Sequence, residues 1–142
     1  MKSKILLYLL TFTTVALFSF ISDSEWQLYK SVDGINIYSK TQTAVEKGIA
    51  KKYLLFKYEN TTGNFVEVSW KLNVWYNGVC RACDLPSPNE YELSLQLKAK
   101  ETKTGSVNSA SKIYKVFYSS DSEGIAPLDK FEFENLKVKV VK

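Results

Sequence analysis

Alternation of apolar and polar residues over positions 66 to 76 constrains the fold of this chain more than any other feature. The residues between the apolar positions are polar, apart from Trp75. Successive side chains of a β-strand point to opposite faces of a sheet, whereas a helical period would scatter the apolar residues around a cylinder. We therefore predict a strand with one face in the core, formed by Val66, Val68, Trp70, Leu72, Val74 and Tyr76.

Three further segments predict strands. Residues 91–99 alternate in the same way as residues 66–76. Residues 52–58 are apolar on both faces, which is typical of a strand in the centre of a sheet, and residues 113–118 are similar. No window of eleven or more residues has a good helical period, and residues 43–47 are expected to form one helical turn at most.

The last segment changes phase in its middle. Phe131 and Phe133 lie in one phase, whereas Leu136 and the apolar residues after it lie in the other. A shift of one residue would turn half of these side chains away from the core. We therefore predict a β-bulge at Glu134–Asn135, which returns both halves to the same face.

A tight turn is predicted near the start of the chain. Asp33-Gly34 separates the apolar residues of 26–32 from Ile35 and Ile37. Both central residues of a type I′ turn need a positive φ, and Asp-Gly meets this need. The pair therefore predicts a β-hairpin.

About seven short strands separated by turn signals predict an all-β protein, an antiparallel β-sandwich of immunoglobulin-like architecture. A small barrel is the alternative. The inter-sheet disulfide of immunoglobulin domains is not expected, because Cys80 and Cys83 both follow Trp70 and Trp75. No repeat or linker divides residues 25–142, so we expect a single domain there.

The N-terminus has the pattern of a secretory signal peptide. Lys2 and Lys4 precede an uncharged, apolar run over residues 5–21, and polar residues follow up to Ser24. Residues 1–24 are therefore predicted to be removed by cleavage before Glu25, and an uncleaved membrane anchor is the alternative. The expected location is the periplasm, the outer surface or the extracellular space, with membrane contact only if this segment is retained.

Composition excludes several kinds of chemistry. The 142 residues include no histidine, which removes Ser-His-Asp and Cys-His catalysis and the commonest metal ligand. No phosphate-binding loop, GxSxG, HExxH or EF-hand motif is present. A net charge of +4 is too small to indicate nucleic acid binding. We expect no cofactor, no metal site and no nucleic acid partner.

Cys80 and Cys83 form a C-R-A-C sequence directly after the predicted strand. In an exported chain the first interpretation is a structural disulfide that closes a tight turn. A reactive redox pair needs a stabilised thiolate, to which Arg81 would contribute and which Asp84 would oppose. Two free thiols and half of a zinc site are the remaining alternatives.

Trp75 is the aromatic residue with the clearest functional interpretation. It lies in the outward phase of the predicted strand, and Tyr76 and Asn77 follow it. An exposed indole ring can stack on a sugar or fill a pocket of a partner. Trp75, Tyr76 and Asn77 are therefore candidate binding residues. The structural alternative is that Trp75 packs under a loop or that the end of the strand twists inward.

Two pairs of acidic residues have the spacing of one strand face. Glu90 and Glu92 form one pair, and Glu132 and Glu134 form the other. Residues two apart on a strand lie about 7 Å apart, which is close to the carboxylate separation in glycosidases. The same pattern is typical of a solvent-exposed face, and we predict no catalytic residue.

The chain resembles the small exported β-sandwich proteins of unknown function that are common in Bacteroidota. The resemblance depends on a composition rich in Lys, Asn and aromatic residues and on three short segments, Asn60-Thr-Thr-Gly-Asn64, Trp75-Tyr-Asn-Gly78 and Leu136-Lys-Val-Lys-Val-Val-Lys142. This family implies no activity. We expect a non-catalytic exported sandwich that binds a protein or an envelope component. A carbohydrate-binding module and an enzyme acting on glycans are the alternatives.

Overall fold

The computed structural model describes residues 24–142, so the predicted signal peptide lies outside the described residues except for Ser24. The Ser24 hydroxyl accepts a hydrogen bond of 2.6 Å from the backbone N–H of Thr41.

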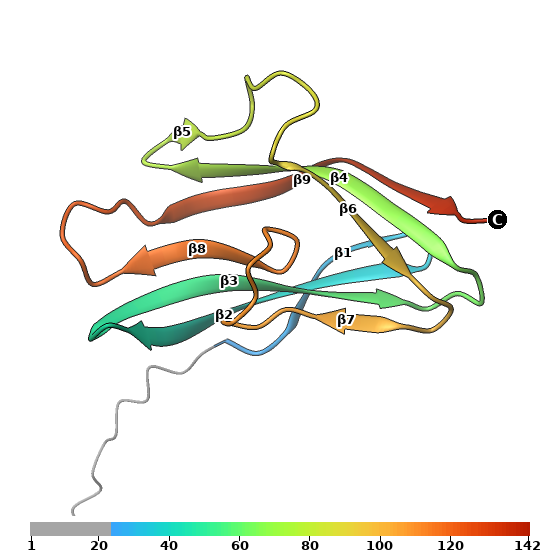
Figure 1. Cartoon of the computed structure of the whole chain (residues 1–142), viewed down its shortest axis with the longest axis horizontal. Helices are drawn as coiled ribbons and strands as arrows, with labels where there is room; N and C mark the ends of the chain where they lie inside the picture. The colour runs from blue at the N-terminus through green and yellow to red at the C-terminus, as the bar shows by residue number, and fades with distance from the viewer. Residues whose placement is uncertain (1–23) are drawn as a thin grey trace, which may run out of the picture.

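Nine strands run through the described residues (Figure 1): β1 (Gln27–Val32), β2 (Ile35–Glu46), β3 (Ile49–Asn60), β4 (Val66–Tyr76), β5 (Val79–Cys80), β6 (Glu92–Leu97), β7 (Thr102–Thr104), β8 (Lys115–Ser120) and β9 (Leu128–Val140).

The strands form two antiparallel sheets that pack face to face. In sheet A, β1 pairs with β2 and β2 with β3, and both β7 and β8 pair with the other side of β3. In sheet B, β9 lies on one side of β4, and both β5 and β6 lie on the other. The predicted all-β sandwich is therefore confirmed, with nine strands instead of about seven. The two additional strands, β5 and β7, have two and three residues, which is too short for an alternating pattern.

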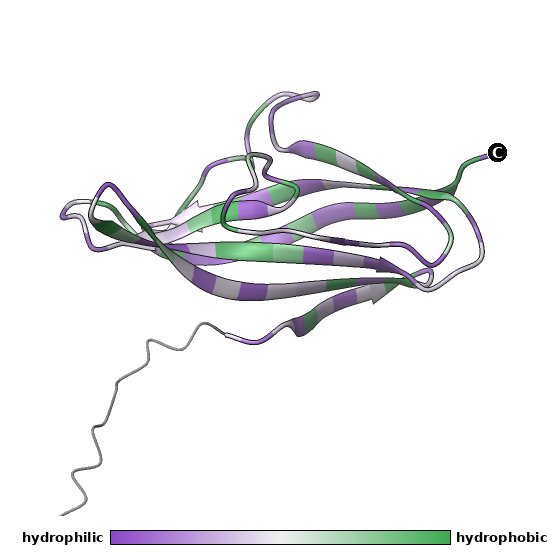
Figure 2. Ribbon diagram, turned by 60° about the horizontal axis from the view of Figure 1, so that its bottom comes forward, coloured by the Kyte–Doolittle hydropathy of each residue, from purple (hydrophilic) through white to green (hydrophobic). Residues whose placement is uncertain are grey.

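The inner faces of β3 and β4 form the centre of the core. The predicted strand 66–76 is β4, whose buried residues include Val66, Val68, Trp70, Leu72 and Val74. Bands of hydrophilic and hydrophobic colour run along the strands in Figure 2. Trp70 is only 3% exposed, and its ring stacks on Phe133 of β9 with 5.0 Å between the ring centroids. The largest apolar side chains that sheet A contributes to this core are Ile35, Ile37, Leu54, Phe56 and Tyr58.

The predicted β-bulge in the last strand is confirmed. Ser69 pairs with Lys137 and Lys71 pairs with Glu134, so Asn135 and Leu136 both lie opposite a single residue of β4. Asn135 has a positive φ of 54°. The extra residue keeps Phe133 and Leu136 on the core side of β9.

Tight turns join β1 to β2 and β2 to β3. Asp33 and Gly34 have φ angles of 47° and 76°, as the predicted hairpin requires. Lys47 and Gly48 have φ angles of 50° and 79° and form a second turn of this kind. Residues 43–46 continue β2, so the single helical turn that the sequence allowed at residues 43–47 does not form.

Aromatic and loop residues close the two edges of the sandwich. At the edge formed by β1 and β9, the bulged Tyr29 contacts Phe131 with 4.7 Å between the ring centroids. Its hydroxyl oxygen accepts a hydrogen bond of 3.3 Å from the Phe133 N–H. At the opposite edge, the Tyr58 hydroxyl donates to the carbonyl oxygen of Ile113, in the segment between β7 and β8. This second edge also carries an aromatic-lined hollow.

Candidate binding groove between the sheets

Two adjoining hollows lie between β8 of sheet A and the β4–β5 region of sheet B. We call them together the inter-sheet groove. They share the side chains of Tyr76, Tyr91 and Phe117. The larger hollow has a volume of about 410 Å³, and its other lining residues are Arg81, Gly124, Ile125 and Ala126. The smaller one, of about 170 Å³, continues inward along Leu72, Val74 and Val116, with Lys112 and Lys115 beside it.

The groove is open because no regular strand covers the middle of β4 on this side. β6 pairs with β4 only as far as Lys71, and β5 pairs only with its last two residues. The segment between β5 and β6 leaves the sheet here and projects from sheet B in Figure 1. Two backbone hydrogen bonds of 2.9 Å tie its ends to β4, from Leu72 N–H to Tyr91 O and from Arg81 N–H to Val74 O.

Tyr76 and Phe117 join the two sheets at the wall of the groove. The Tyr76 hydroxyl donates a hydrogen bond of 2.6 Å to the carbonyl oxygen of Phe117. The two rings are 6.3 Å apart and inclined by 32°. Burial raises the pKa of Tyr76 from 10.0 to about 12. The hydroxyl therefore stays protonated, and keeps donating this bond, throughout the neutral range.

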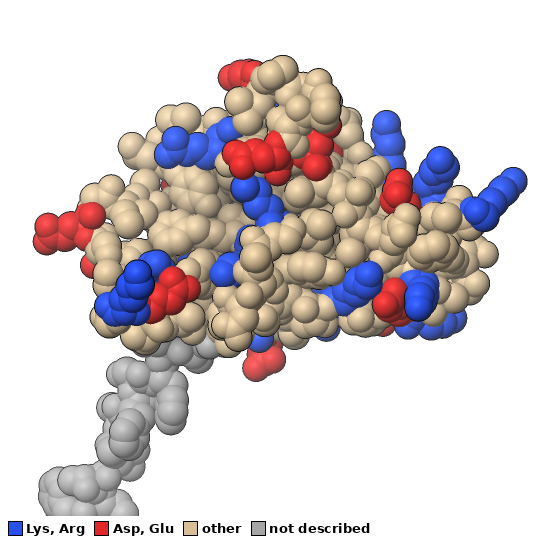
Figure 3. All heavy atoms as spheres, in the orientation of Figure 1, with Lys and Arg blue, Asp and Glu red and all other residues tan. Residues whose placement is uncertain are grey.

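Cationic side chains lie over the rings at the rim. Lys112 Nζ is 5.1 Å from the centre of the Tyr91 ring, and Arg81 Cζ is 5.9 Å from that of Tyr76. Lys112 also forms an ion pair with Glu90, with 3.0 Å between nitrogen and oxygen. No aspartate or glutamate lines either hollow. In the space-filling view of Figure 3, Lys and Arg side chains lie between the two sheets, with Asp and Glu side chains close beside them. The groove thus combines apolar walls with a rim formed by Arg81 and the Lys112–Glu90 ion pair.

Only one of the three predicted binding residues lies in the groove. Tyr76 points inward and packs against the core, whereas Trp75 is on the opposite face of β4, with Lys130 Nζ 4.1 Å from its ring centre. Asn77 has a φ of 52° and forms a turn with Gly78. The three residues therefore do not share one surface. Tyr91, Phe117, Arg81 and Ile125 were not identified from the sequence.

Cys80 and Cys83 are paired, as the sequence predicts. Their Sγ atoms are at disulfide-bond distance, 1.94 Å, and residues 24–142 contain no free cysteine. Ala82, between them, is fully buried, and the Lys71 Nζ donates to the Cys83 carbonyl oxygen over 3.5 Å. The pair therefore lies within one loop of sheet B, where it holds Arg81 at the rim of the groove.

Of the two acidic pairs, Glu90 lies at the rim of the groove, because its partner Lys112 lines the smaller hollow. Glu90 is exposed and paired with Lys112, and Glu92 is exposed opposite Lys71 on the outer face of sheet B. On the same face, Glu134 accepts a hydrogen bond of 2.9 Å from the Asn73 side chain. Across the described part of the chain, no group of three or more Cys, Asp or Glu side chains is placed to hold a metal ion.

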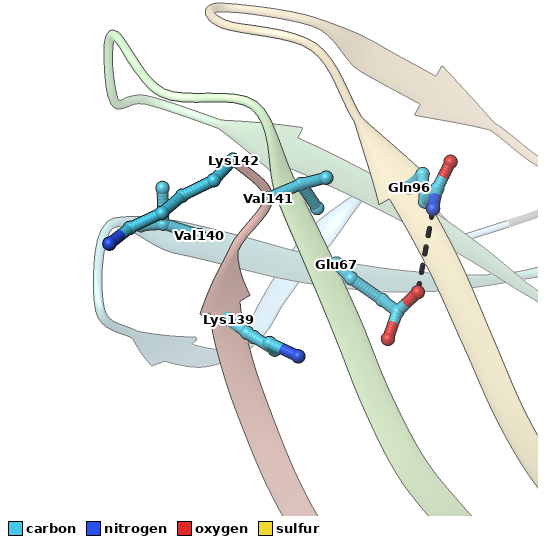
Figure 4. A pocket seen from close by; sticks show the side chains of 6 residues that line it. All are labelled: Glu67, Gln96, Lys139, Val140, Val141 and Lys142. Atoms are coloured by element: carbon cyan, nitrogen blue, oxygen red, sulfur yellow. Dashed lines mark hydrogen bonds between the residues drawn. The ribbon is translucent and has the colours of Figure 1, made fainter.

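A further hollow, of about 470 Å³, lies beside the C-terminus and has a different character (Figure 4). Gln96 donates a hydrogen bond of 3.4 Å to Glu67 across it, and the other lining residues are the last four of the chain. Val140 and Val141 are its only apolar lining residues, and no ring borders it. The inter-sheet groove is therefore the stronger candidate site, since binding pockets are mostly apolar with a few placed polar groups.

Comparisons with protein-family models, with curated proteins and with solved structures found no match to this chain. Residues 24–142 contain no helix that is long and apolar enough to cross a membrane.

Proposed function

We propose that this protein is an exported, non-catalytic binding domain whose inter-sheet groove contacts a protein or another component of the cell envelope. The observation that carries the proposal is the meeting of Tyr76, Tyr91 and Phe117, from both sheets, in one open hollow. Ile125 stands at its mouth and is 49% exposed. Aromatic residues and arginine dominate the binding energy of many interfaces.

Export is the part of the proposal that depends on the sequence. The charged start, the apolar run over residues 5–21 and the polar residues that follow are typical of a signal peptide. We expect mass spectrometry of the exported protein to find its N-terminus at Glu25. An intact Met1 in the membrane fraction would show that the segment is a retained anchor.

The carbohydrate-binding alternative has less support. A sugar platform needs exposed rings in one plane, but Trp75 and Tyr76 lie on opposite faces of β4, and Lys130 stands over the Trp75 ring. The rings of Tyr76 and Phe117 are inclined by 32°, so the groove has angled walls instead of a flat surface. This geometry suits an inserted side chain better than a stacked sugar.

Site-specific photo-crosslinking in the cells that export the protein tests the binding function. A photoreactive phenylalanine analogue replaces Ile125, and in a control protein it replaces Leu28. Leu28 is a matched control because it is 58% exposed and lies on β1, the opposite edge strand of sheet A. We expect one defined adduct from position 125 and none from position 28. Equal labelling from both positions, or no adduct from 125, would contradict the proposal.

A further inference from the structure

Arg81 is the feature of the groove that points to a ligand class. Its side chain is exposed, and its guanidinium lies over the Tyr76 ring. The two ion pairs within residues 24–142 are Lys51–Glu46 and Lys112–Glu90, so Arg81 has no carboxylate partner in that part of the chain. A planar guanidinium binds a carboxylate through two parallel hydrogen bonds, which makes an unpaired arginine a specific receptor for an acid.

The neighbouring cations are already occupied. Lys112 is paired with Glu90, and the Lys115 Nζ donates a hydrogen bond of 2.8 Å to the carbonyl oxygen of Val107. Arg81 is thus the cation of the groove that remains for a ligand. It is also held in place, because it lies between two bonded cysteines and its N–H donates to Val74 O. A side chain on an ordered loop loses less freedom on binding.

The strand beside the groove favours an extended peptide as the occupant. Among the described residues, β8 pairs with β3 alone, and its residues Lys115, Val116 and Phe117 line the groove. The Phe117 carbonyl oxygen is already bonded to the Tyr76 hydroxyl, so an added chain would pair with the other backbone groups of this edge. The backbone of an edge strand can pair with an added extended chain, while pockets beside it take alternate side chains. The apolar walls formed by Val116, Phe117 and Tyr91 provide such a pocket.

We infer that the groove binds a peptide segment of a partner protein in which an apolar side chain stands next to a carboxylate. This inference rests on the proposed function. The apolar side chain inserts among Tyr76, Tyr91 and Phe117. The carboxylate pairs with Arg81 at the rim. The ligand class therefore follows from one apolar hollow and one unpaired guanidinium placed side by side.

Selection from a random dodecapeptide library displayed on phage tests this inference with the exported, disulfide-bonded protein. We expect the enriched sequences to carry Asp or Glu within two positions of an aromatic or aliphatic residue. A synthetic peptide of the enriched sequence should bind the Arg81→Gln variant about tenfold more weakly, because it loses the paired guanidinium. Lys130→Gln is the matched control, since Lys130 also covers a ring but lies over Trp75, outside the groove. This control should bind the peptide as the unchanged protein does.

Each other outcome overturns the inference. Enriched peptides without an acid, or equal binding by Arg81→Gln, would show that the guanidinium does not choose the ligand. Failure to enrich any peptide, together with displacement of a fluorescent fatty acid by decanoate, would assign the groove to lipid carboxylates. If the adduct from position 125 persists in these cases, the proposed binding function stands and only the ligand class is wrong. If photo-crosslinking at position 125 gives no adduct, the proposed binding function is wrong as well.

Discussion

The hydroxyl of Tyr76 on β4 donates its hydrogen to the carbonyl oxygen of Phe117 on β8, 2.6 Å away, and this bond connects the two sheets at the wall of the groove. Both residues also line the groove with their rings. The contact therefore has two roles, because it fixes the distance between the sheets and sets the shape of the hollow.

Alkaline pH should weaken the fold through Tyr76. Its pKa is raised from 10.0 to about 12, so between these values the unfolded chain loses a proton that the folded chain keeps. The stabilisation is complete below about pH 10 and is lost as the pH approaches 12. Tyr76→Phe should lower the free energy of unfolding at pH 7 by about 0.5–1.5 kcal/mol, through loss of the hydrogen bond.

Urea unfolding between pH 7 and 12 measures this effect. The difference in unfolding free energy between the unchanged protein and Tyr76→Phe should shrink above pH 10. Burial also raises the pKa of Tyr58, but Tyr58 is present in both proteins and its effect cancels. A difference that stays constant over the whole range would contradict the assigned shift.

Trp70 and Trp75 should differ strongly in their contribution to stability. Trp70 is 3% exposed and stacks on Phe133, so Trp70→Ala should cost about 3–5 kcal/mol, as large core truncations do. Total stabilities are about 5–15 kcal/mol, so this loss is severe. Trp75→Ala removes a partly exposed ring and its contact with Lys130, and should cost about 1 kcal/mol or less. Equal losses in urea unfolding would show that the assignment of the two faces of β4 is wrong.

The disulfide should matter more for the groove than for the fold. Cys80 and Cys83 are three positions apart, and stabilisation by a disulfide grows with loop length. The double variant Cys80→Ser/Cys83→Ser should therefore keep its β circular dichroism spectrum and lose at most about 2 kcal/mol. It should weaken peptide binding because Arg81 is no longer held on a closed loop. Thiol titration of the unreduced protein should find no free thiol, and two free thiols would refute the structural role.

Asn135 should resist replacement by a β-branched residue. Its φ of 54° is tolerated by asparagine and glycine but strained for valine. Asn135→Val should cost about 1–3 kcal/mol, and Asn135→Gly should change stability little. Lys137→Val is the control, because Lys137 is exposed and lies in the extended part of the same strand. Similar thermal unfolding of all three variants would mean that the bulge does not set the register of β9.

Local patterns predicted much of the fold. The alternation in β4, the Asp33-Gly34 turn and the phase change at Asn135 each depend on a few neighbouring residues, and each was found as predicted. The second half of β2 was missed because Thr41 and Thr43 occupy its inner face, so no apolar alternation marks it. The sequence signal for this part of β2 is the Lys47-Gly48 pair, which marks the turn at the end of the strand.

The candidate site depended on contacts that no local pattern contains. The alternation in β4 already places Tyr76 inward and Trp75 outward, so the sequence itself separates these two residues. The meeting of Tyr76 with Phe117 is different, because it requires β8 to face β4 across the sandwich from 41 positions away. In the sequence, Arg81 stands out only as a neighbour of two cysteines, and its place at the rim follows from the loop that they close.

The measurement that most directly tests the central claim is the affinity of the crosslinked partner for two alanine variants. Tyr91 is one of the three residues that line both hollows of the proposed binding groove, whereas Trp75 lies on the other face of β4. Isothermal titration should give a dissociation constant about tenfold or more higher for Tyr91→Ala and nearly unchanged for Trp75→Ala. Circular dichroism should confirm that both variants are folded. Weakened binding by Trp75→Ala with unchanged binding by Tyr91→Ala would contradict the account and move the site to the outer face of sheet B.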